Sequence, residues 1–510
     1  MDTLASYDEL PYDSLPLPET QPDFLAAVAR LHGFDAPDPR RARILELGCA
    51  QGGNLVPLAW RWPESTCVGV ELSRVQAAAG ANFVAQLGLQ NCHILHGDLA
   101  ALPDDLGQFG YIIAHGVFSW VPPAVQQALL DVCRRHLAPQ GVAYISFNVA
   151  AGWSALQPLR EALIARTDSS LSAPARHAQA LRVLDQLQAE WRDPALLKEI
   201  AYLKTAAPSY LFHEYLAEFN VPLSFGEFAA ALDAHDLRYI GEAGPRRAVV
   251  ELEDAWGLIP ESMAGRWLDA ESALDEALGT RFRRALIART DAPCARPPMR
   301  DALRELAFYA DLACEEELDL EQNSEQCFVN PAGNTFAVTD AFAKAALIAL
   351  SSLYPRALTY PDLLAAAHAV RREFGVPDDA PLSADEFDAA WFTLATTHGV
   401  MLTLPEQADV DAACEPGSYP HAHALSRLQA ATPGWVVSGV RHVAIDLDAP
   451  GRALVQWMDG SRNQAGLAAA MQAFLAEGGI NMPPEQIEAR SDQQLWQLVR
   501  QGLCVGDWGG

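Results

Sequence analysis

Basic side chains are scarce in this chain of 510 residues. Lysine occurs only at Lys198, Lys204 and Lys344, and 36 Lys and Arg stand against 65 Asp and Glu, giving a formal net charge of −29. A chain this acidic repels phosphate backbones and anionic lipid surfaces. The composition therefore disfavours nucleic acid as a substrate and favours a basic or neutral partner.

Long apolar runs and paired cysteines are also missing. No segment approaches the roughly 18 apolar residues of a membrane span, and the acidic N-terminus lacks the pattern of a secretory signal. The nine cysteines include no CxxC pair, and no Cys/His cluster has the spacing of a metal site. We therefore expect a cytoplasmic protein without a metal, in which Cys49, Cys67, Cys92 and Cys133 are buried core thiols.

Short apolar segments alternate with longer amphipathic segments over the first 150 residues. The expected strands are 43–47, 67–70, 93–96, 111–115 and 142–147, and the expected helices are 22–32, 54–62, 73–87 and 123–137. This alternation predicts an α/β fold, a Rossmann-like domain whose parallel sheet is covered by helices on both faces.

We expect this domain to span residues 1–245. A helical insertion over 154–205 would cover the substrate side, and 210–243 would supply the last two strands of the sheet, with Tyr239 in the final one. This placement requires Tyr239 to pair with a strand of the N-terminal sheet.

The remaining chain is expected to form three further units. A mainly helical connecting or regulatory region would cover 246–330, and a final α+β domain would cover 409–510. Between them, 331–408 is predicted to be winged-helix-like, because helix patterns at 336–354, 360–374 and 384–398 precede a strand pattern at 400–405. This segment is not basic, so we expect it to contact protein rather than DNA.

The sequence ILELGCAQGGN (44–54) is the most informative local motif. An apolar strand carries Glu46 near its end, and a turn containing Gly48 and Gly52 opens a helix, so that a ligand can approach the backbone closely. The turn lacks the third spaced glycine of a dinucleotide site and the lysine of a P-loop. It therefore favours S-adenosylmethionine (SAM), which brings no pyrophosphate to be neutralised.

Two further acids close the next two strands. Glu71 follows the turn by about twenty residues, where a carboxylate accepts the hydroxyls of a ribose. Asp98 would bind the adenine amino group, and Leu99 would present a backbone N–H. The predicted SAM-binding residues are Glu46, Gly48, Ala50, Gly52, Asn54, Glu71, Leu72, Asp98, Leu99 and His115.

The ends of the fourth and fifth strands, IIAHGVFSWVPP (112–123) and SFNVAAGW (146–153), carry the candidate residues around the methyl acceptor. Ser119 is one candidate there. Because methyl transfer mainly needs in-line positioning, we expect His115 to be a hydrogen-bonded wall rather than a base. Two interpretations are open for Trp120: it faces a cationic substrate or the sulfonium, or it is a tryptophan of the core. The predicted catalytic residues are His115, Trp120, Asn148 and Trp153.

These motifs resemble the bacterial class I methyltransferases with a methyltransferase regulatory domain, a family that includes protein-lysine methyltransferases of outer-membrane proteins. The resemblance covers roughly residues 7–290 and rests on YDELPY, ELGCAQGGNL, AHGVFSWVP, CRRHLAPQGVAYISFN, YLFHEYLAEFN and RFRRALIART. It implies SAM as methyl donor, S-adenosylhomocysteine as product and nitrogen as acceptor atom. It also implies that Tyr7, Tyr12, Tyr210 and His213 bind the substrate.

One departure from the family leaves the acceptor open. Ala150 and Ala151 stand where the family usually has Tyr-Pro, which makes the pocket wall wider and less polar. Three functions therefore compete: a protein N-methyltransferase acting on lysine, a small-molecule methyltransferase of secondary metabolism, and a non-catalytic cofactor-binding scaffold. We favour the first, because the acidic surface suits a lysine-bearing protein or peptide and the C-terminal domains suit a macromolecule. A homodimer is also open.

Overall fold

The computed structural model describes residues 9, 10, 12–244, 266–294, 298–377, 384–397, 399–413 and 415–505. Of the predicted site residues, Tyr7 lies outside these ranges.

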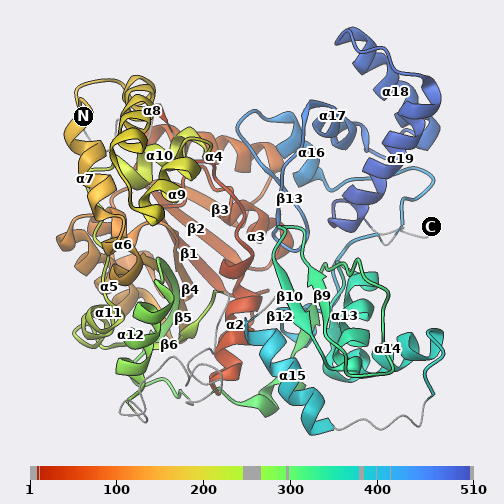
Figure 1. Ribbon diagram of the computed structural model, residues 1–510, viewed down its shortest axis with the longest axis horizontal. Coiled ribbons are helices and arrows are strands. Elements are labelled where there is room, and N and C mark those ends of the chain that lie inside the picture. The colour runs from red at the N-terminus through yellow and green to blue at the C-terminus, as the bar shows by residue number, and fades with distance from the viewer. Residues whose placement is uncertain are drawn as a thin grey trace.

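A seven-stranded sheet forms the centre of the N-terminal half (Figure 1). Its order is β3-β2-β1-β4-β5-β7-β6. Strand β7 is antiparallel to both of its neighbours, whereas the other six strands share one direction. The strands are β1 (Arg43–Leu47), β2 (Thr66–Glu71), β3 (Cys92–His96), β4 (Phe109–Ala114), β5 (Leu137–Asn148), β6 (Leu237–Glu242) and β7 (Phe282–Arg289). The predicted Rossmann-like fold class is confirmed.

The register of the parallel strands gathers the predicted cofactor residues at one edge. Glu46 of β1 lies between Gly69 of β2 and Ile113 of β4. Glu71, the last residue of β2, pairs with His96 of β3. The carboxyl ends of these strands therefore meet where ligands bind in α/β sheets.

Helices cover both faces of the sheet. One core cluster joins helices α2, α3 and α4 to the sheet, and a second joins α5 and α11 to its other face. These helices are α2 (Pro22–Leu31), α3 (Leu55–Arg61), α4 (Arg74–Leu87), α5 (Pro123–His136) and α11 (Phe225–Asp233). Short 3-10 helices are η1 (Pro18–Thr20), η2 (Leu99–Ala101), η3 (Asp104–Leu106), η4 (Phe118–Trp120), η8 (Arg300–Glu305) and η9 (Pro405–Gln407).

Residues 150–203 form the predicted helical unit. Figure 1 shows these helices grouped beyond one end of the sheet. They share a core of their own, in which Leu163, Leu184 and Ile200 are fully buried. The helices are α6 (Ala150–Ser154), α7 (Gln157–Arg166), α8 (Ala173–Glu190), α9 (Pro194–Leu203) and, packed on them, α10 (Pro208–Tyr215).

The prediction that 210–243 holds the last two strands is wrong for the first of them. Pro208–Tyr215 is helix α10, with a proline at its first turn, where its fixed φ suits a helix. The strand between β5 and β6 is instead β7, and Tyr239 of β6 pairs with Ile287 of β7 as the placement required. The Rossmann-like sheet thus continues to Arg289, beyond the predicted boundary at 245.

Strand β7 escaped prediction because of its arginines. The segment FRRALIAR is buried along most of its length. The two arginines near its start instead suggest an exposed segment. The guanidinium of Arg283 is buried by pairing with Glu271 and Asp275 of helix α12 (Trp267–Leu278). Long charged side chains enter a core only when such partners are present.

The described part of 246–330 is not mainly helical, contrary to expectation. Besides α12 and η8 it holds β7, β8 (Ala307–Tyr309) and β9 (Gln326–Val329). Strand β8 joins a three-stranded sheet with β11 (Leu358–Thr359) and β12 (Met401–Thr403). Each of these strands is too short to stand out in a sequence pattern.

The C-terminal half packs on the α2 side of the sheet (Figure 1). Residues 331–408 contain the three predicted helices and the strand that follows, although β10 (Thr335–Val338) precedes the first helix. These helices are α13 (Ala341–Leu353), α14 (Tyr360–Glu373) and α15 (Ala384–Thr397). The last unit comprises α16 (Ala424–Ala431), β13 (Val437–Ser438), β14 (Ala444–Ile445), α17 (Ala449–Trp457), α18 (Gln464–Glu477) and α19 (Pro484–Arg500). Within the described ranges, no helix combines the length and apolar character that crossing a membrane would need.

Candidate functional site

The turn after β1 has the conformation that its glycines predicted. Gly48 and Gly52 have φ values of +70° and +89°, and Ala50 has a φ of +50°. A Cβ on Gly48 would lie 2.6 Å from Cγ2 of Val117. Glycine is therefore needed at Gly48 both for its backbone angle and for the approach of the segment after β4.

The carboxyl group of Glu46 is buried behind this turn. Oε1 accepts a hydrogen bond of 2.9 Å from Nδ2 of Asn54, whereas Oε2 is buried and has no partner among the described residues. Burial raises the pKa of Glu46 to about 8. This unpaired oxygen fits a ligand that brings a hydrogen-bond donor or a positive charge to the turn.

Glu71 has the opposite environment. Its Oε2 accepts from the backbone N–H of Ala50 at 2.9 Å, and its Oε1 accepts from the N–H of Ser73 at 2.7 Å. The carboxylate is thereby held between the turn and the start of α4. A carboxylate at the end of the second strand is where folds of this kind bind the hydroxyls of a ribose.

The neighbouring residues can form an adenine site. Leu72 is 52% exposed and Leu95 is 43% exposed, although both are apolar. Asp98 is exposed and caps η2 by accepting from the N–H of Ala100 at 2.9 Å. Leu99 lies next to Asp98 and is half-buried. An apolar surface bordered by an acid suits the ring and amino group of adenine, so the residues present fit SAM.

His115 lies just after β4 and is hydrogen-bonded. Its Nδ1 lies 2.9 Å from the hydroxyl of Tyr144, and its ring packs edge-on against Phe282 with centroids 5.8 Å apart. Burial lowers the pKa of His115 to about 4. The ring is therefore neutral and only weakly basic at pH 7, and its role as a wall rather than a base stays a prediction.

The other predicted catalytic residues lie at the junction with the helical unit. The N–H of Asn148 donates to Oγ of Ser119 at 2.8 Å, and Nδ2 of Asn148 donates to Oδ1 of Asn220 at 3.0 Å. Trp120 and Trp153 pack edge-on with centroids 6.2 Å apart. Trp153 is only 5% exposed and belongs to the core of the helical unit, so packing accounts for this side chain.

The predicted substrate residues of α10 meet the N-terminal segment. Tyr12 stacks on His213 with centroids 4.8 Å apart, and its hydroxyl donates to Oε1 of Glu214 at 2.9 Å. Nε2 of His213 lies 2.5 Å from the carbonyl oxygen of Leu10. Tyr210 lies one turn before these residues on the same helix, where its ring packs against Tyr202.

Glu214 is a site residue that the sequence interpretation missed. Burial raises its pKa to about 7, and the hydrogen bond from Tyr12 lowers the pKa only in part. The signal in the sequence was its position four residues after Tyr210, which places both side chains on one helix face.

The same N-terminal segment also contacts the cofactor turn. Oγ of Ser14 accepts from the N–H of Gly53 at 2.8 Å. Further along, the N–H of Leu17 and the hydroxyl of Thr20 both donate to Oδ1 of Asn54 at 3.0 Å. Residues 12–20 therefore connect the cofactor turn to the acceptor candidates on α10.

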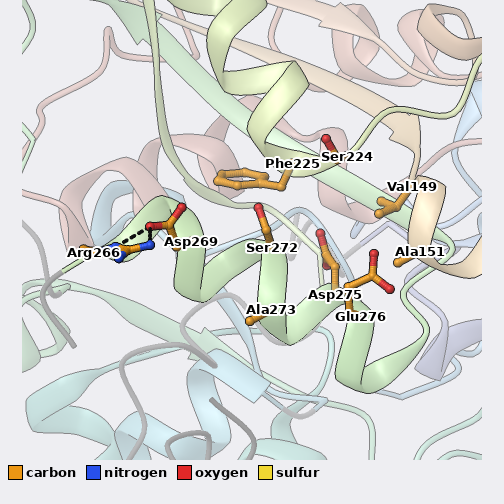
Figure 2. A pocket seen from close by; sticks show the side chains of 10 residues that line it. All are labelled: Val149, Ala151, Ser224, Phe225, Arg266, Asp269, Ser272, Ala273, Asp275 and Glu276. Atoms are coloured by element: carbon orange, nitrogen blue, oxygen red, sulfur yellow. Dashed lines mark hydrogen bonds and ion pairs between the residues drawn. The ribbon is translucent and has the colours of Figure 1, made fainter. Parts of the chain in front are cut away.

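A cavity of about 240 Å³ lies beside the altered Ala150–Ala151 pair. Figure 2 shows Val149 and Ala151 at one end, with Ser224 and Phe225 facing helix α12. Asp269, Ser272, Ala273, Asp275 and Glu276 of α12 and the preceding Arg266 complete the lining. Ala151 borders this cavity, but charged and polar side chains form much of the lining, so the expected wider and less polar wall of the acceptor pocket stays a prediction. Among the described residues, no cluster of three or more His, Cys, Asp or Glu side chains can hold a metal ion.

Three family models match the chain. A methyltransferase domain matches residues 44–141, a predicted methyltransferase regulatory domain matches 207–289, and the PKMT C-terminal winged helix domain matches 418–503. The winged-helix match falls on the last unit, C-terminal to the 331–408 unit in which we expected that topology.

Similar proteins cover most of this length. The uncharacterized protein RP789 of Rickettsia prowazekii is 31% identical over 385 residues, which are 71% of this chain and 68% of the relative. A second uncharacterized protein of that organism, RP028, is 33% identical over 229 residues, which are 44% of this chain and 92% of the relative. The structure of PKMT2 from Rickettsia typhi in complex with AdoHcy superposes with a TM-score of 0.81 at 20% identity, covering 97% of this chain and 100% of that one.

These findings define an enzyme of the class I SAM-dependent methyltransferases, with SAM as its cofactor and S-adenosylhomocysteine as its product. Within this class, the chain belongs to the family that combines the methyltransferase regulatory domain with the PKMT C-terminal winged helix domain.

Proposed function

We propose that this enzyme methylates the side-chain nitrogen of lysine in a protein or peptide, and that Glu214 receives the lysine ammonium. The observation that carries this proposal is the environment of Glu214. Its Oε1 accepts from the hydroxyl of Tyr12, whose ring stacks on His213, and Tyr210 lies one turn away on the same helix face. A half-buried carboxylate next to aromatic rings suits an ammonium group.

The chemistry of lysine methylation explains why such a group is useful. The nitrogen must lose a proton before its lone pair can attack. A carboxylate with a pKa of about 7 can first pair with the ammonium and then accept its proton. When bound, SAM supplies a methyl group on a positively charged sulfur, and S-adenosylhomocysteine is left after the transfer.

In this proposal, the carboxylates near the cofactor turn hold SAM and the wall residues orient the amine. Glu71 would bind the ribose, Asp98 the adenine and Glu46 the positive end of the cofactor. His115 and Asn148 would border the methyl group at the ends of β4 and β5. The winged-helix relatives bear the name PKMT, which denotes protein-lysine methyltransferases and supports the same acceptor.

We also propose a basic protein partner and a cytoplasmic location. The formal net charge of −29 supports a partner rich in lysine. The scattered cysteines, eight of which are free thiols in the described residues, suit a reducing compartment.

Isotope transfer tests the acceptor directly. The enzyme is incubated with SAM labelled in its methyl group and a bacterial lysate, and labelled material is separated and digested for mass spectrometry. We expect label in protein, on lysine nitrogen. Label in small extractable molecules, or in protein at residues other than lysine, would contradict the proposal, as would the absence of any label.

A substitution tests the role of Glu214. We expect Glu214→Gln to lower kcat at pH 7 by about 100-fold, because the amide cannot accept a proton. The affinity for SAM, measured by calorimetry, should stay unchanged. Glu477→Gln, at an exposed site on α18, is the matched control and should retain full activity. Full activity of Glu214→Gln would remove this residue from the mechanism.

The second candidate is a small-molecule methyltransferase, which the cavity beside Ala151 favours. Its volume of about 240 Å³ suits a small ligand, and the carboxylates of Asp269 and Glu276 border it. The lysate experiment separates the two candidates, because label would then appear in small extractable molecules.

A further inference from the structure

We propose that His442, in the C-terminal unit, is a positioning residue that holds the cofactor turn in the conformation that binds SAM. Nε2 of His442 lies 2.7 Å from Oδ1 of Asn54, the residue that closes the turn. The two residues are 388 positions apart in the chain. The proposal rests on SAM binding alone and does not depend on which molecule is methylated.

Asn54 is the point at which three parts of the molecule meet. Its Oδ1 faces His442 and also accepts from Leu17 and Thr20 of the N-terminal segment. A carbonyl oxygen has two lone pairs, so these contacts fully use its capacity as an acceptor. The contact with His442 is the shortest of the three.

The other end of the Asn54 amide reaches the site itself. Nδ2 donates to Glu46, so His442, Asn54 and Glu46 form a continuous chain of hydrogen bonds. Asn54 occupies the N-cap position of α3, where asparagine commonly caps the helix, yet its side chain makes no capping bond. The side chain is thus used to join the C-terminal unit to the buried carboxyl group.

The protonation state of His442 allows it to donate a hydrogen bond to Asn54 over a wide range of pH. Burial lowers the pKa of His442 to about 3, so the ring is neutral and its Nε2–H can donate to Asn54. Its backbone lies in the left-handed region with a φ of +60°, in a turn where its N–H donates to Gly439 at 2.9 Å. A histidine keeps this conformation only where its surroundings fix it.

Neighbouring residues hold the same turn against the cofactor domain. Nε2 of Gln51, inside the cofactor turn, donates to the carbonyl oxygen of Gly434 at 2.7 Å. Trp435 stacks on Phe83 of α4 with centroids 3.5 Å apart and ring planes at 12°. The segment 434–442 therefore contacts the cofactor turn at two places and helix α4 at a third.

Arg441 secures this segment to the middle of the molecule. The guanidinium is buried and donates to the carbonyl oxygens of Pro355, Gln407 and Ala408. Arg441 thus attaches segment 434–442 to the middle of the molecule, and within this segment the bond from His442 to Asn54 is the one that leads on to Glu46. By linkage, a partner that moves segment 434–442 would change SAM affinity, and SAM would change the affinity for that partner equally.

Two polar substitutions of His442 separate positioning from packing in the full-length protein. In His442→Gln, the amide Nε2 lies about as far from the backbone as Nε2 of histidine and can still donate to Asn54. In His442→Asn, the amide nitrogen is one bond closer to the backbone and cannot reach Asn54. Asparagine also tolerates the left-handed backbone. We expect His442→Asn to raise the Kd for SAM, measured by calorimetry, about tenfold through loss of one hydrogen bond. His442→Gln should stay within about threefold of the wild type.

Two further measurements distinguish a positioning role of His442 from a purely structural role. KM for SAM should rise in His442→Asn while KM for the methyl acceptor stays constant, and hydrogen exchange should increase in residues 48–54. His421→Leu, at an exposed position in the same unit, is the control and should bind SAM normally. Equal losses in the Asn and Gln variants, or unchanged SAM affinity in the Asn variant, would overturn the proposal. If the Asn variant does not fold, wild-type affinity in a folded His442→Leu variant would overturn it equally.

Discussion

Two carboxyl groups at the edge of the sheet differ because of their surroundings. Glu46 has one unpaired, buried oxygen and a pKa raised to about 8, so without a ligand it is mostly protonated at pH 7, and the positive charge of SAM would favour its carboxylate. Glu71 accepts from the backbone N–H groups of Ala50 and Ser73, which hold its carboxylate between the cofactor turn and α4. The environment of each side chain, rather than its chemical type, therefore separates their roles at the cofactor site.

The role of Glu71 can be measured through a single change. Glu71→Gln removes the negative charge and leaves only one acceptor for the backbone groups of Ala50 and Ser73. We expect the affinity for SAM to fall by about 10- to 100-fold, the size of a lost charge-assisted hydrogen bond. Calorimetry is the measurement, and Glu64→Gln, at an exposed ion pair with Arg41, is the control. Unchanged affinity would refute the ribose assignment.

Glu214 predicts a dependence of the rate on pH. The mechanism needs its carboxylate in the charged form, which predominates above its pKa of about 7, so kcat should rise with pH and level off above about pH 8. Tyr12 lowers this pKa through its hydrogen bond. Tyr12→Phe should therefore move the inflection of the pH–rate profile to a higher pH. If the inflection does not move, the group that titrates in the profile is not Glu214.

At the scale of elements, helix α4 fixes the cofactor turn by close contact. A Cβ on Gly80 would lie 2.5 Å from the carbonyl oxygen of Gln51 and 2.6 Å from Cδ1 of Ile94. Ser73 caps the start of the helix, and Gly88 ends it with a φ of +70°. The helix therefore has well-defined ends and leaves no room for a side chain toward the turn.

This packing predicts an unusual effect of alanine. Gly80→Ala should improve helix propensity by about 1 kcal/mol, yet it must push α4 away from the turn. We expect the Kd for SAM to rise about fivefold or more, since a displaced turn loses part of a hydrogen bond. Ala78→Gly, at an exposed position of α4, lowers propensity and should leave SAM affinity unchanged. Wild-type affinity of Gly80→Ala would show that the turn does not depend on α4.

At the scale of the whole molecule, the cofactor turn is approached from several directions. Residues 12–20 contact it and also reach Glu214 on α10, while segment 434–442 contacts it from the C-terminal unit. One apolar core runs from α2 through the C-terminal half and includes Phe308, Trp391 and Trp435. Because cores are densely packed, a shift in one unit is transmitted to its neighbours. The two halves therefore behave as parts of one enzyme.

The order of α10 and β7 shows the limit of local patterns. The apolar residues of YLFHEYL suggest a strand, yet this segment is a helix. The arginines of FRRALIAR suggest an exposed segment, yet it is a mostly buried strand. Their states depend on Pro208 at the helix start and on acids of α12 that pair with Arg283. A short apolar run cannot be assigned by periodicity alone.

The sequence by itself determined the cofactor half of this protein. Strands β1 to β5 follow a regular alternation with helices, which a local sequence pattern shows. The glycine turn and the acids Glu46, Glu71 and Asp98 lie within 60 consecutive residues, so short segments of the sequence are enough to identify the cofactor site. Only the tertiary structure decided the rest. It joined Tyr12 to Glu214 across 202 positions and His442 to Asn54 across 388. It also placed Trp153 in a core. Contacts between distant segments depend on how whole faces pack, and no local pattern records that packing.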